Sequence, residues 1–188
     1  MKIKLILSMA FLVGMVWTTN AQEIKAHGVE FPAKMKINNQ VVKYNGAGLR
    51  EKYFFDLYVS ALYLPEKSDD AQKIVDMDKE SCIRIKLVSD KVTRDKFVET
   101  VKDGFGTSTE GKATDAQIKE FMDYFNTEFK IGDDIILIYK PKEGVQIYMN
   151  GKNLGGTKGL EFKKVLWGIW FGKEPADKGL KKAMLGNI

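Results

Sequence analysis

The chain has 188 residues, with 30 Lys and Arg against 25 Asp and Glu, a net charge of +5, and 44% hydrophobic residues. This composition is typical of a globular protein, and the length favours one domain that buries its core without disulfides or metal. A single Cys and a single His exclude an internal disulfide and a Cys/His zinc cage. Because the basic residues are scattered among acidic ones, the charge pattern argues against nucleic-acid binding.

The N-terminus has the layout of a secretory signal peptide. Two lysines precede an apolar run from Leu5 to Trp17, and small and polar residues follow up to Ala21. We therefore predict a signal peptide over residues 1–21 and a single domain over residues 22–188. The domain is expected in the periplasm or outside the cell, with no membrane span after cleavage. The alternative is that the segment is kept as an N-terminal anchor.

The first half of the mature chain has mostly strand patterns. Strands are expected at Ile24–Phe31, Met35–Ile37, Val41–Tyr44, Tyr53–Leu64 and Cys82–Val88. In the run Asn45–Arg50, two glycines are separated by one alanine, which predicts a sharp turn and the close approach of another group. In the long strand that ends before Pro65, odd positions form a continuous apolar face and even positions include polar residues.

Helices follow in the middle and at the end of the chain. They are expected over Asp69–Met77, over Thr93–Phe105, from a capping box at Thr114 along an apolar stripe to Phe129, over Phe162–Trp170, and over Asp177–Leu185. Strands at Ile135–Tyr139 and Val145–Met149 form a meander with a tight turn at Asn150-Gly151. This order predicts an α+β fold, in which a large antiparallel sheet is backed by helices with a cleft between the layers.

Arg50 is the best candidate for a binding residue. If the strand runs back to it without a bulge, Arg50 shares parity with Asp56, Tyr58 and Ser60, so one wall of the cleft can be polar. A guanidinium offers a planar fork of donors to a carboxylate or phenolate, and a tyrosine hydroxyl adds another donor. The alternative is that Arg50 pairs with Asp56, Glu51 or a backbone carbonyl and only stabilises the turn.

Other polar signals favour structural roles. The adjacent acids Asp133 and Asp134 are typical of a turn before a strand. No acid or nucleophile lies at a sequence spacing from His27 that would suggest catalysis, so His27 is expected to be structural or exposed. Trp167, Trp170 and Phe171 have the helical spacing of core residues, although they are also suited to line a ligand cavity.

An ordered series of motifs resembles the bacterial chalcone isomerase-like proteins from about Gly28 to Gly186. The motifs are Asn45–Arg50, Tyr58–Leu64, Asn150-Gly151, Ile169–Gly172 with Pro175 and Asp177, and Leu185-Gly186. The resemblance implies the chalcone isomerase fold, an open-faced β-sandwich with a large antiparallel sheet backed by helices and a ligand cleft between them. This agrees with the α+β prediction.

The resemblance also bears on function. In plant isomerases an Arg, a Thr on the next strand, and a Tyr and an Asn on a later helix support the reaction. Here Arg50 matches the Arg, Tyr58 stands about where the Thr would be, and Phe97 and Gly104 fall near the helix positions. Because most of this oxygen network is missing, we predict no catalytic residues. We also predict no cofactor, since the glycines of Asn45–Arg50 match neither a dinucleotide nor a phosphate loop, and no metal.

The resemblance implies instead a binding protein for a fatty acid or a similar amphipathic carboxylate. In fatty-acid-binding relatives of this fold the matching Arg and a Tyr hold the carboxylate, so Arg50 would anchor the acid and Tyr58 or Tyr63 would donate a second hydrogen bond. Two alternatives stay open: an isomerase, that is, an intramolecular lyase acting on a chalcone-like or other enone, and a structural or partner-binding periplasmic protein.

Overall fold

The fold is an antiparallel meander with helices on one face. A computed structural model describes residues 22–187, so the predicted signal peptide lies outside the described residues. The strands are β1 (Glu23–Ala26), β2 (Val29–Pro32), β3 (Lys34–Ile37), β4 (Gln40–Lys52), β5 (Phe55–Leu64), β6 (Ser81–Leu87), β7 (Asp134–Lys140), β8 (Gly144–Met149) and β9 (Lys152–Thr157). The helices are α1 (Ala71–Asp76), α2 (Arg94–Thr107), α3 (Asp115–Asp123), α4 (Leu160–Phe171) and α5 (Lys178–Met184).

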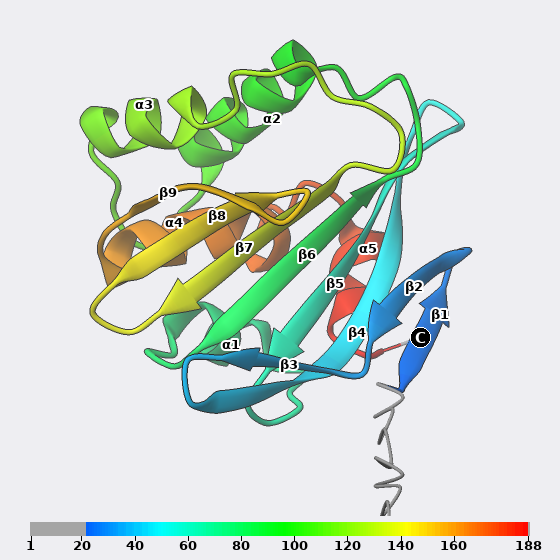
Figure 1. Cartoon of the computed structure of the whole chain (residues 1–188). Coiled ribbons are helices and arrows are strands. Elements are labelled where there is room, and N and C mark those ends of the chain that lie inside the picture. Colours follow the sequence, from blue (N-terminus) through cyan, green and yellow to red (C-terminus); the bar gives the residue numbers. More distant parts are fainter. Residues whose placement is uncertain (1–21, 188) are drawn as a thin grey trace, which may run out of the picture.

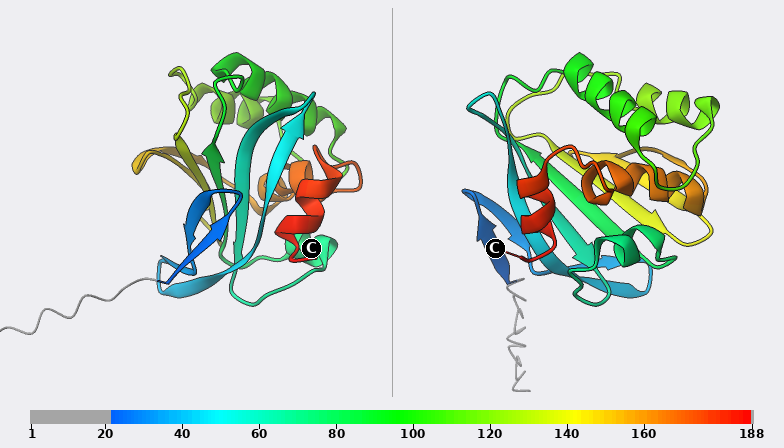
Figure 2. Two further views of the ribbon diagram at one scale, coloured as in Figure 1. Left: turned by 90° about the vertical axis from the view of Figure 1, so that its right-hand side faces the viewer. Right: turned by 180° about the vertical axis from the view of Figure 1, so that it is seen from behind.

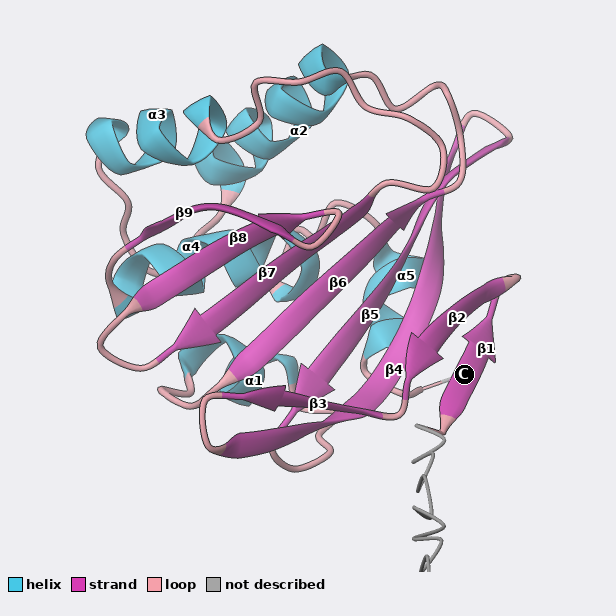
Figure 3. Cartoon of the chain, in the orientation of Figure 1, coloured by secondary structure: helices cyan, strands magenta, loops and turns pink. Residues whose placement is uncertain are grey.

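Seven of these strands form one sheet. Strands β3 to β9 pair in chain order, every neighbour antiparallel, while β1 and β2 form a separate two-stranded sheet. Figure 1 shows the curled sheet with α4 and α5 behind it, and Figure 3 shows the same arrangement by secondary structure. The α+β prediction and its antiparallel sheet backed by helices are therefore confirmed. No helix among residues 22–187 combines the length and the apolar character that crossing a bilayer requires.

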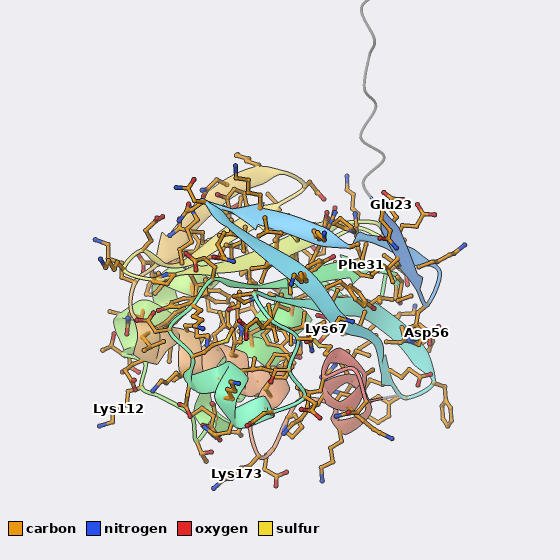
Figure 4. All side chains as sticks on the ribbon, turned by 90° about the horizontal axis from the view of Figure 1, so that it is seen from below. Glu23, Phe31, Asp56, Lys67, Lys112 and Lys173 are labelled. Carbon is orange, nitrogen blue, oxygen red and sulfur yellow. The ribbon has the colours of Figure 1, made fainter. Side chains whose placement is uncertain are left out.

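Each face of the sheet has its own hydrophobic cluster. The larger cluster lies between the sheet and the helices and includes Tyr58, Phe97 and Trp170. The smaller one lies on the other face and includes Phe31 of β2 together with Tyr63 of β5. Figure 2 shows the β1–β2 hairpin on the side away from α5, and Figure 4 labels Phe31 there. Because side chains alternate along a strand, neighbouring residues of β5 serve different clusters.

The capping box at Thr114 forms as expected. The Thr114 hydroxyl accepts from the backbone N–H of Gln117 at 3.2 Å, and the Gln117 side chain accepts from the backbone N–H of Thr114 at 3.0 Å. The helix itself is shorter than the apolar stripe, since α3 ends at Asp123. Phe125 lies beyond it, fully buried, with its carbonyl oxygen accepting from Arg94 Nε at 2.7 Å. A core contact and a side-chain donor thus replace the helical hydrogen bond that a longer α3 would supply.

The expected strand over residues 24–31 is wrong, because this segment is a hairpin. Its turn is formed by His27, with a φ of 47°, and Gly28, with a φ of 79°. Two consecutive left-handed residues form the tight turn that matches the twist of a two-stranded ribbon. His27 is exposed at this turn.

The expected sharp turn at residues 45–50 is also wrong, because these residues continue β4. A register irregularity between Tyr44 and Gly46 bends the strand without ending it. The chain turns instead at Tyr53 and Phe54, where φ is 51° and 68°. Strand β5 therefore begins at Phe55, two residues later than expected.

The close approach that the two glycines permit does occur, and the approaching group is α5. A Cβ atom at Gly48 would lie 2.7 Å from Cβ of Ala183, and one at Gly46 would lie 2.8 Å from the carbonyl oxygen of Met184. Asn45 fixes this contact, because its Nδ2 donates to the carbonyls of Ser68 and Met184, both at 2.9 Å. Glycines in β4 thus place α5 directly on the strand that carries Arg50.

We expect the change Gly46→Ala to lower the free energy of unfolding by about 2–3 kcal/mol, because the added methyl group overlaps α5 backbone. Chemical denaturation measures the loss. The matched control is Gly106→Ala in α2, where a Cβ atom would meet nothing within 4 Å. That change should stabilise the protein by up to ~1 kcal/mol, as alanine does in a helix. Equal effects of the two changes would contradict the packing argument.

Candidate functional site

A cavity of about 370 Å³ opens between the β4–β5 end of the sheet, α2 and the end of α4. Its volume falls within the range of about 300–1,000 Å³ that is usual for small-molecule sites. It is lined by Arg50, Lys52, Tyr53, Phe55, Leu57, Tyr58, Lys91, Val92, Lys96, Phe97, Glu99, Thr100, Val101, Ile169, Trp170 and Ala176. Most of the wall is apolar, and four of the five charged lining residues are cationic.

Arg50 is held in this cavity by the pairing of two strands. It lies directly opposite Tyr58 in the β4–β5 register, so both side chains face the helices. Arg50 is only 7% exposed, its guanidinium carbon lies 5.9 Å from the centre of the Tyr58 ring, and its buried Nη1 has no hydrogen-bond partner. Such a guanidinium is a strong, oriented donor for an anion.

No acid neutralises Arg50 within residues 22–187. None of the ion pairs in this part of the chain includes Arg50. Glu51 and Asp56 lie opposite one another in the strand register and are exposed. Asp177 is the nearby acid that raises the pKa of Tyr58, but its Oδ1 accepts from the backbone N–H of Leu180 at 2.8 Å and caps α5. The structure therefore does not show the alternative in which an acid holds Arg50.

Two further donors lie beside the guanidinium. Burial raises the pKa of Tyr58, and the positive charge of Arg50 and the Trp170 side chain oppose that rise. Trp170 Nε1 is itself buried without a hydrogen-bond partner. Seven buried side-chain nitrogen and oxygen atoms lack a hydrogen-bond partner among residues 22–187. Two of them, Arg50 Nη1 and Trp170 Nε1, belong to side chains that line this cavity, where an acceptor on a ligand would satisfy them.

Tyr63, the other tyrosine predicted to bind ligand, lies away from this cavity. It is five residues beyond Tyr58 on β5, and an odd separation puts the two side chains on opposite faces. Tyr63 packs in the smaller cluster, with its ring centre 6.0 Å from that of Tyr44 in an edge-to-face arrangement. The structure thus brings Arg50 together with Tyr58 and not with Tyr63.

The turn before β7 has the structural role expected of Asp133 and Asp134. Asp134 forms an ion pair with Arg84 at 2.7 Å, and Asp133 accepts from Asn150 Nδ2 at 2.9 Å.

The aromatic residues of α4 divide between core and cavity. Trp167 and Phe171 are buried in the larger cluster, and Trp170 also lines the cavity.

Of the α2 wall, sequence reasoning placed only Phe97 near the site, through the family resemblance, and it did not identify the rest of that wall or the lysines at the cavity mouth. Lys96 and Thr100 line the cavity from one face of α2, and their spacing of four residues was the available signal. Lys52 ends β4 and Lys91 lies between β6 and α2, so the two lysines meet only in three dimensions and no local pattern connected them.

Comparison with known proteins identifies the family. The chain matches the chalcone isomerase-like family over residues 21–186. A fatty-acid-binding protein of Arabidopsis thaliana has a similar solved structure, with a TM-score of 0.70 at 20% sequence identity, covering 88% of this chain and 97% of that chain. At this identity the likeness shows a shared fold. A comparison with curated protein sequences found no significant match. Because the family match covers nearly all of the described residues, the chain belongs to the chalcone isomerase-like family.

Proposed function

We propose that the protein is exported and binds a fatty acid or a similar amphipathic carboxylate in the cavity. The carboxylate accepts hydrogen bonds from Arg50 and Tyr58, and the alkyl chain lies along the apolar wall that includes Phe97, Val101 and Ile169. The observation that supports this function is the buried guanidinium of Arg50, which has an unpartnered Nη1 and faces an open cavity. The fatty-acid-binding protein of similar fold adds support.

The electrostatics favour an anionic head group. A buried charge without a counterion is unfavourable by several kcal/mol, and an entering carboxylate removes much of that penalty while forming charge-assisted hydrogen bonds. A purely structural role predicts a closed cleft and an Arg50 paired with protein acids. The cleft instead contains a cavity of about 370 Å³, and Arg50 has no ion pair within residues 22–187.

Mass spectrometry of ligands extracted from natively purified protein tests the function directly. We expect fatty acids to co-purify, and delipidated protein to take up dodecanoate much more tightly than dodecanol, which has the same chain without the charge. A delipidated protein that takes up no fatty acid of any chain length would overturn the proposal.

The two tyrosines provide a matched pair of variants. Tyr58→Phe should weaken dodecanoate binding about fivefold to tenfold, because it removes one hydrogen bond worth ~1 kcal/mol. Tyr63→Phe removes the same hydroxyl group on the opposite face of β5 and should leave the affinity unchanged. Isothermal titration calorimetry of delipidated proteins measures both. If Tyr63→Phe loses more affinity than Tyr58→Phe, the second hydrogen bond comes from Tyr63 and our assignment to Tyr58 is wrong.

The isomerase alternative uses the same guanidinium, which can also bind a phenolate. It is tested by incubating the protein with a chalcone and following flavanone formation. Phe97, which lines the cavity, offers no polar group to support that reaction. Turnover that is lost in Arg50→Leu would favour the enzyme over the binding protein.

A further inference from the structure

The hairpin between β4 and β5 exposes three consecutive aromatic side chains. Tyr53 is 79% exposed, Phe54 is 104% exposed and Phe55 is 51% exposed. We call Tyr53, Phe54 and Phe55 the aromatic tip. Among residues 22–187 only two other large hydrophobic side chains are exposed, Val41 and Ile131. Figure 2 shows this hairpin projecting beyond the body of the molecule, and Figure 4 labels Asp56 at its base.

The backbone of the aromatic tip is held in an unfavourable conformation. Tyr53 and Phe54 both have positive φ, 51° and 68°. Bulky residues rarely adopt this left-handed region, in which glycine or asparagine is more stable. Strained conformations of this kind concentrate at functional positions. An exposed apolar surface at such a position indicates an occupant outside the chain.

Lysines flank the aromatic tip, and one of them, Lys91, also forms a long surface ion pair with the exposed Asp90 at 3.8 Å. Lys52 Nζ lies 5.5 Å from the centre of the Tyr53 ring, and Lys91 Nζ lies 5.9 Å from that of Phe55. Lys96 lies with these two lysines on the cavity wall, where Glu99 is the only acid. The nearby acids Glu51 and Asp56 lie opposite one another, behind the tip in the hairpin.

The aromatic tip is also continuous with the mouth of the cavity. Tyr53 and Phe55 line the cavity, whereas Phe54 is fully exposed and is not a lining residue. Arg50 lies farther in, buried, on the same strand as Lys52. A hydrophobic surface that the tip contacts therefore lies next to the entrance.

We propose that the aromatic tip docks on an anionic lipid bilayer. Aromatic side chains insert at the boundary between head groups and acyl chains, and lysines beside them are attracted to anionic head groups. Lys52, which has no ion pair among residues 22–187, and Lys91, whose pair with Asp90 is long, favour an anionic bilayer over a neutral apolar surface. The role of this contact rests on the proposed function, since it places the cavity mouth where a fatty acid enters or leaves the membrane.

A fluorescent label on the tip tests the docking. Phe54→Cys is labelled with an environment-sensitive nitrobenzoxadiazole, while Cys82 stays unlabelled because it is fully buried and burial raises the pKa of its thiol. Vesicles of equimolar phosphatidylcholine and phosphatidylglycerol should shift the emission to the blue and raise it several-fold. Vesicles of phosphatidylcholine alone, or high salt, should produce a much smaller change.

The control carries the same label at Val41→Cys, an exposed hydrophobic position on β4, outside the hairpin tip. Its emission should not change with either vesicle. Both variants have the same N-terminal segment, so membrane binding through that segment affects them alike. No change at position 54, or the same change at both positions, would overturn the docking proposal, and a protein partner would then be the remaining occupant.

The variant Phe54→Asn separates docking from ligand binding. Asparagine tolerates the left-handed backbone, and removing the phenyl group should weaken binding to the anionic vesicles about tenfold. Its affinity for dodecanoate in solution should equal that of the unchanged protein, because Phe54 does not line the cavity. If this variant binds the vesicles as tightly as the unchanged protein, the docking proposal is contradicted and the proposed function is not. If neither the unchanged protein nor Phe54→Asn binds dodecanoate while vesicle binding is as expected, the proposed function is contradicted and the docking proposal is not.

Discussion

Replacing Arg50 with Leu is expected to weaken dodecanoate binding by about a hundredfold or more. The carboxylate loses its charge-assisted donor and enters a buried site without a counterion, a loss of roughly 2–5 kcal/mol for a buried charge pair. Unlike most arginine deletions, this one should not lower the free energy of unfolding of the empty protein, since Nη1 has no partner to lose. Calorimetric titration and chemical denaturation on delipidated protein measure the two effects.

Arg84→Leu is the matched control. Arg84 lies in β6 and pairs with Asp134 at 2.7 Å, and it does not line the cavity. Its loss should lower the stability and leave the affinity for dodecanoate unchanged. If Arg50→Leu binds within threefold of the unchanged protein, the carboxylate site is not at Arg50.

Lys163→Met should produce the largest loss of stability. Lys163 is fully buried on α4, and its ammonium donates to the carbonyls of Ile74, Val75 and Met77 at 2.7, 2.8 and 3.1 Å. These carbonyls lie at the end of α1, where no intrahelical donor remains. Leaving them unsatisfied costs about 1–3 kcal/mol each, partly offset by removing a buried charge, so we expect a net loss of about 2–5 kcal/mol.

The same residue gives a pH dependence of definite sign. Burial lowers the pKa of Lys163 to about 7, and the negative charge of Asp76 partly opposes this lowering. Between that value and the ordinary lysine pKa, the unfolded chain binds more protons than the folded one. The free energy of unfolding therefore rises with pH from about 7 to about 10, and this group adds no pH dependence below that range.

Denaturation at several pH values, with Lys163→Met as reference, isolates the rise in the unchanged protein. Lys164→Met is the control, because Lys164 forms surface ion pairs with Asp76 and Glu161 and should contribute ~1 kcal/mol or less. A difference between the unchanged protein and Lys163→Met that stays constant across pH 7–10 would contradict the lowered pKa.

Signals local in sequence predicted much of the fold. The capping box at Thr114 and the alternation along β5 each depend on neighbours within a few residues, and both correspond to what the structure shows. The shared wall of Arg50 and Tyr58 was also predicted, but for the wrong reason: the chain turns at Tyr53 and Phe54, and the pairing of β4 with β5 brings the two side chains together. The alternation along β5 assigned Tyr63 to the other face, so the choice between the two tyrosines could have been made from parity alone.

The errors arose where tertiary contacts decide the backbone. Gly46 and Gly48 look like a turn in sequence, and only the packing of α5 explains why an extended strand needs them. The true turn at Tyr53 and Phe54 has aromatic residues that are typical of strands, so propensity pointed the wrong way. Lys52 at the end of β4 and Lys91 in the segment between β6 and α2 meet at the cavity mouth, a proximity that no local pattern encodes.

The alternation of β5 separates two design problems. Position 58 faces the cavity, whereas positions 59, 61 and 63 face the β1–β2 hairpin. Substitutions at Tyr58, or at Leu57 at the rim of the cavity, can retune which molecule is accepted. The three odd positions can meanwhile be left unchanged, so the ligand specificity of an engineered receptor can be altered while the hydrophobic cluster on the other face of the sheet is kept.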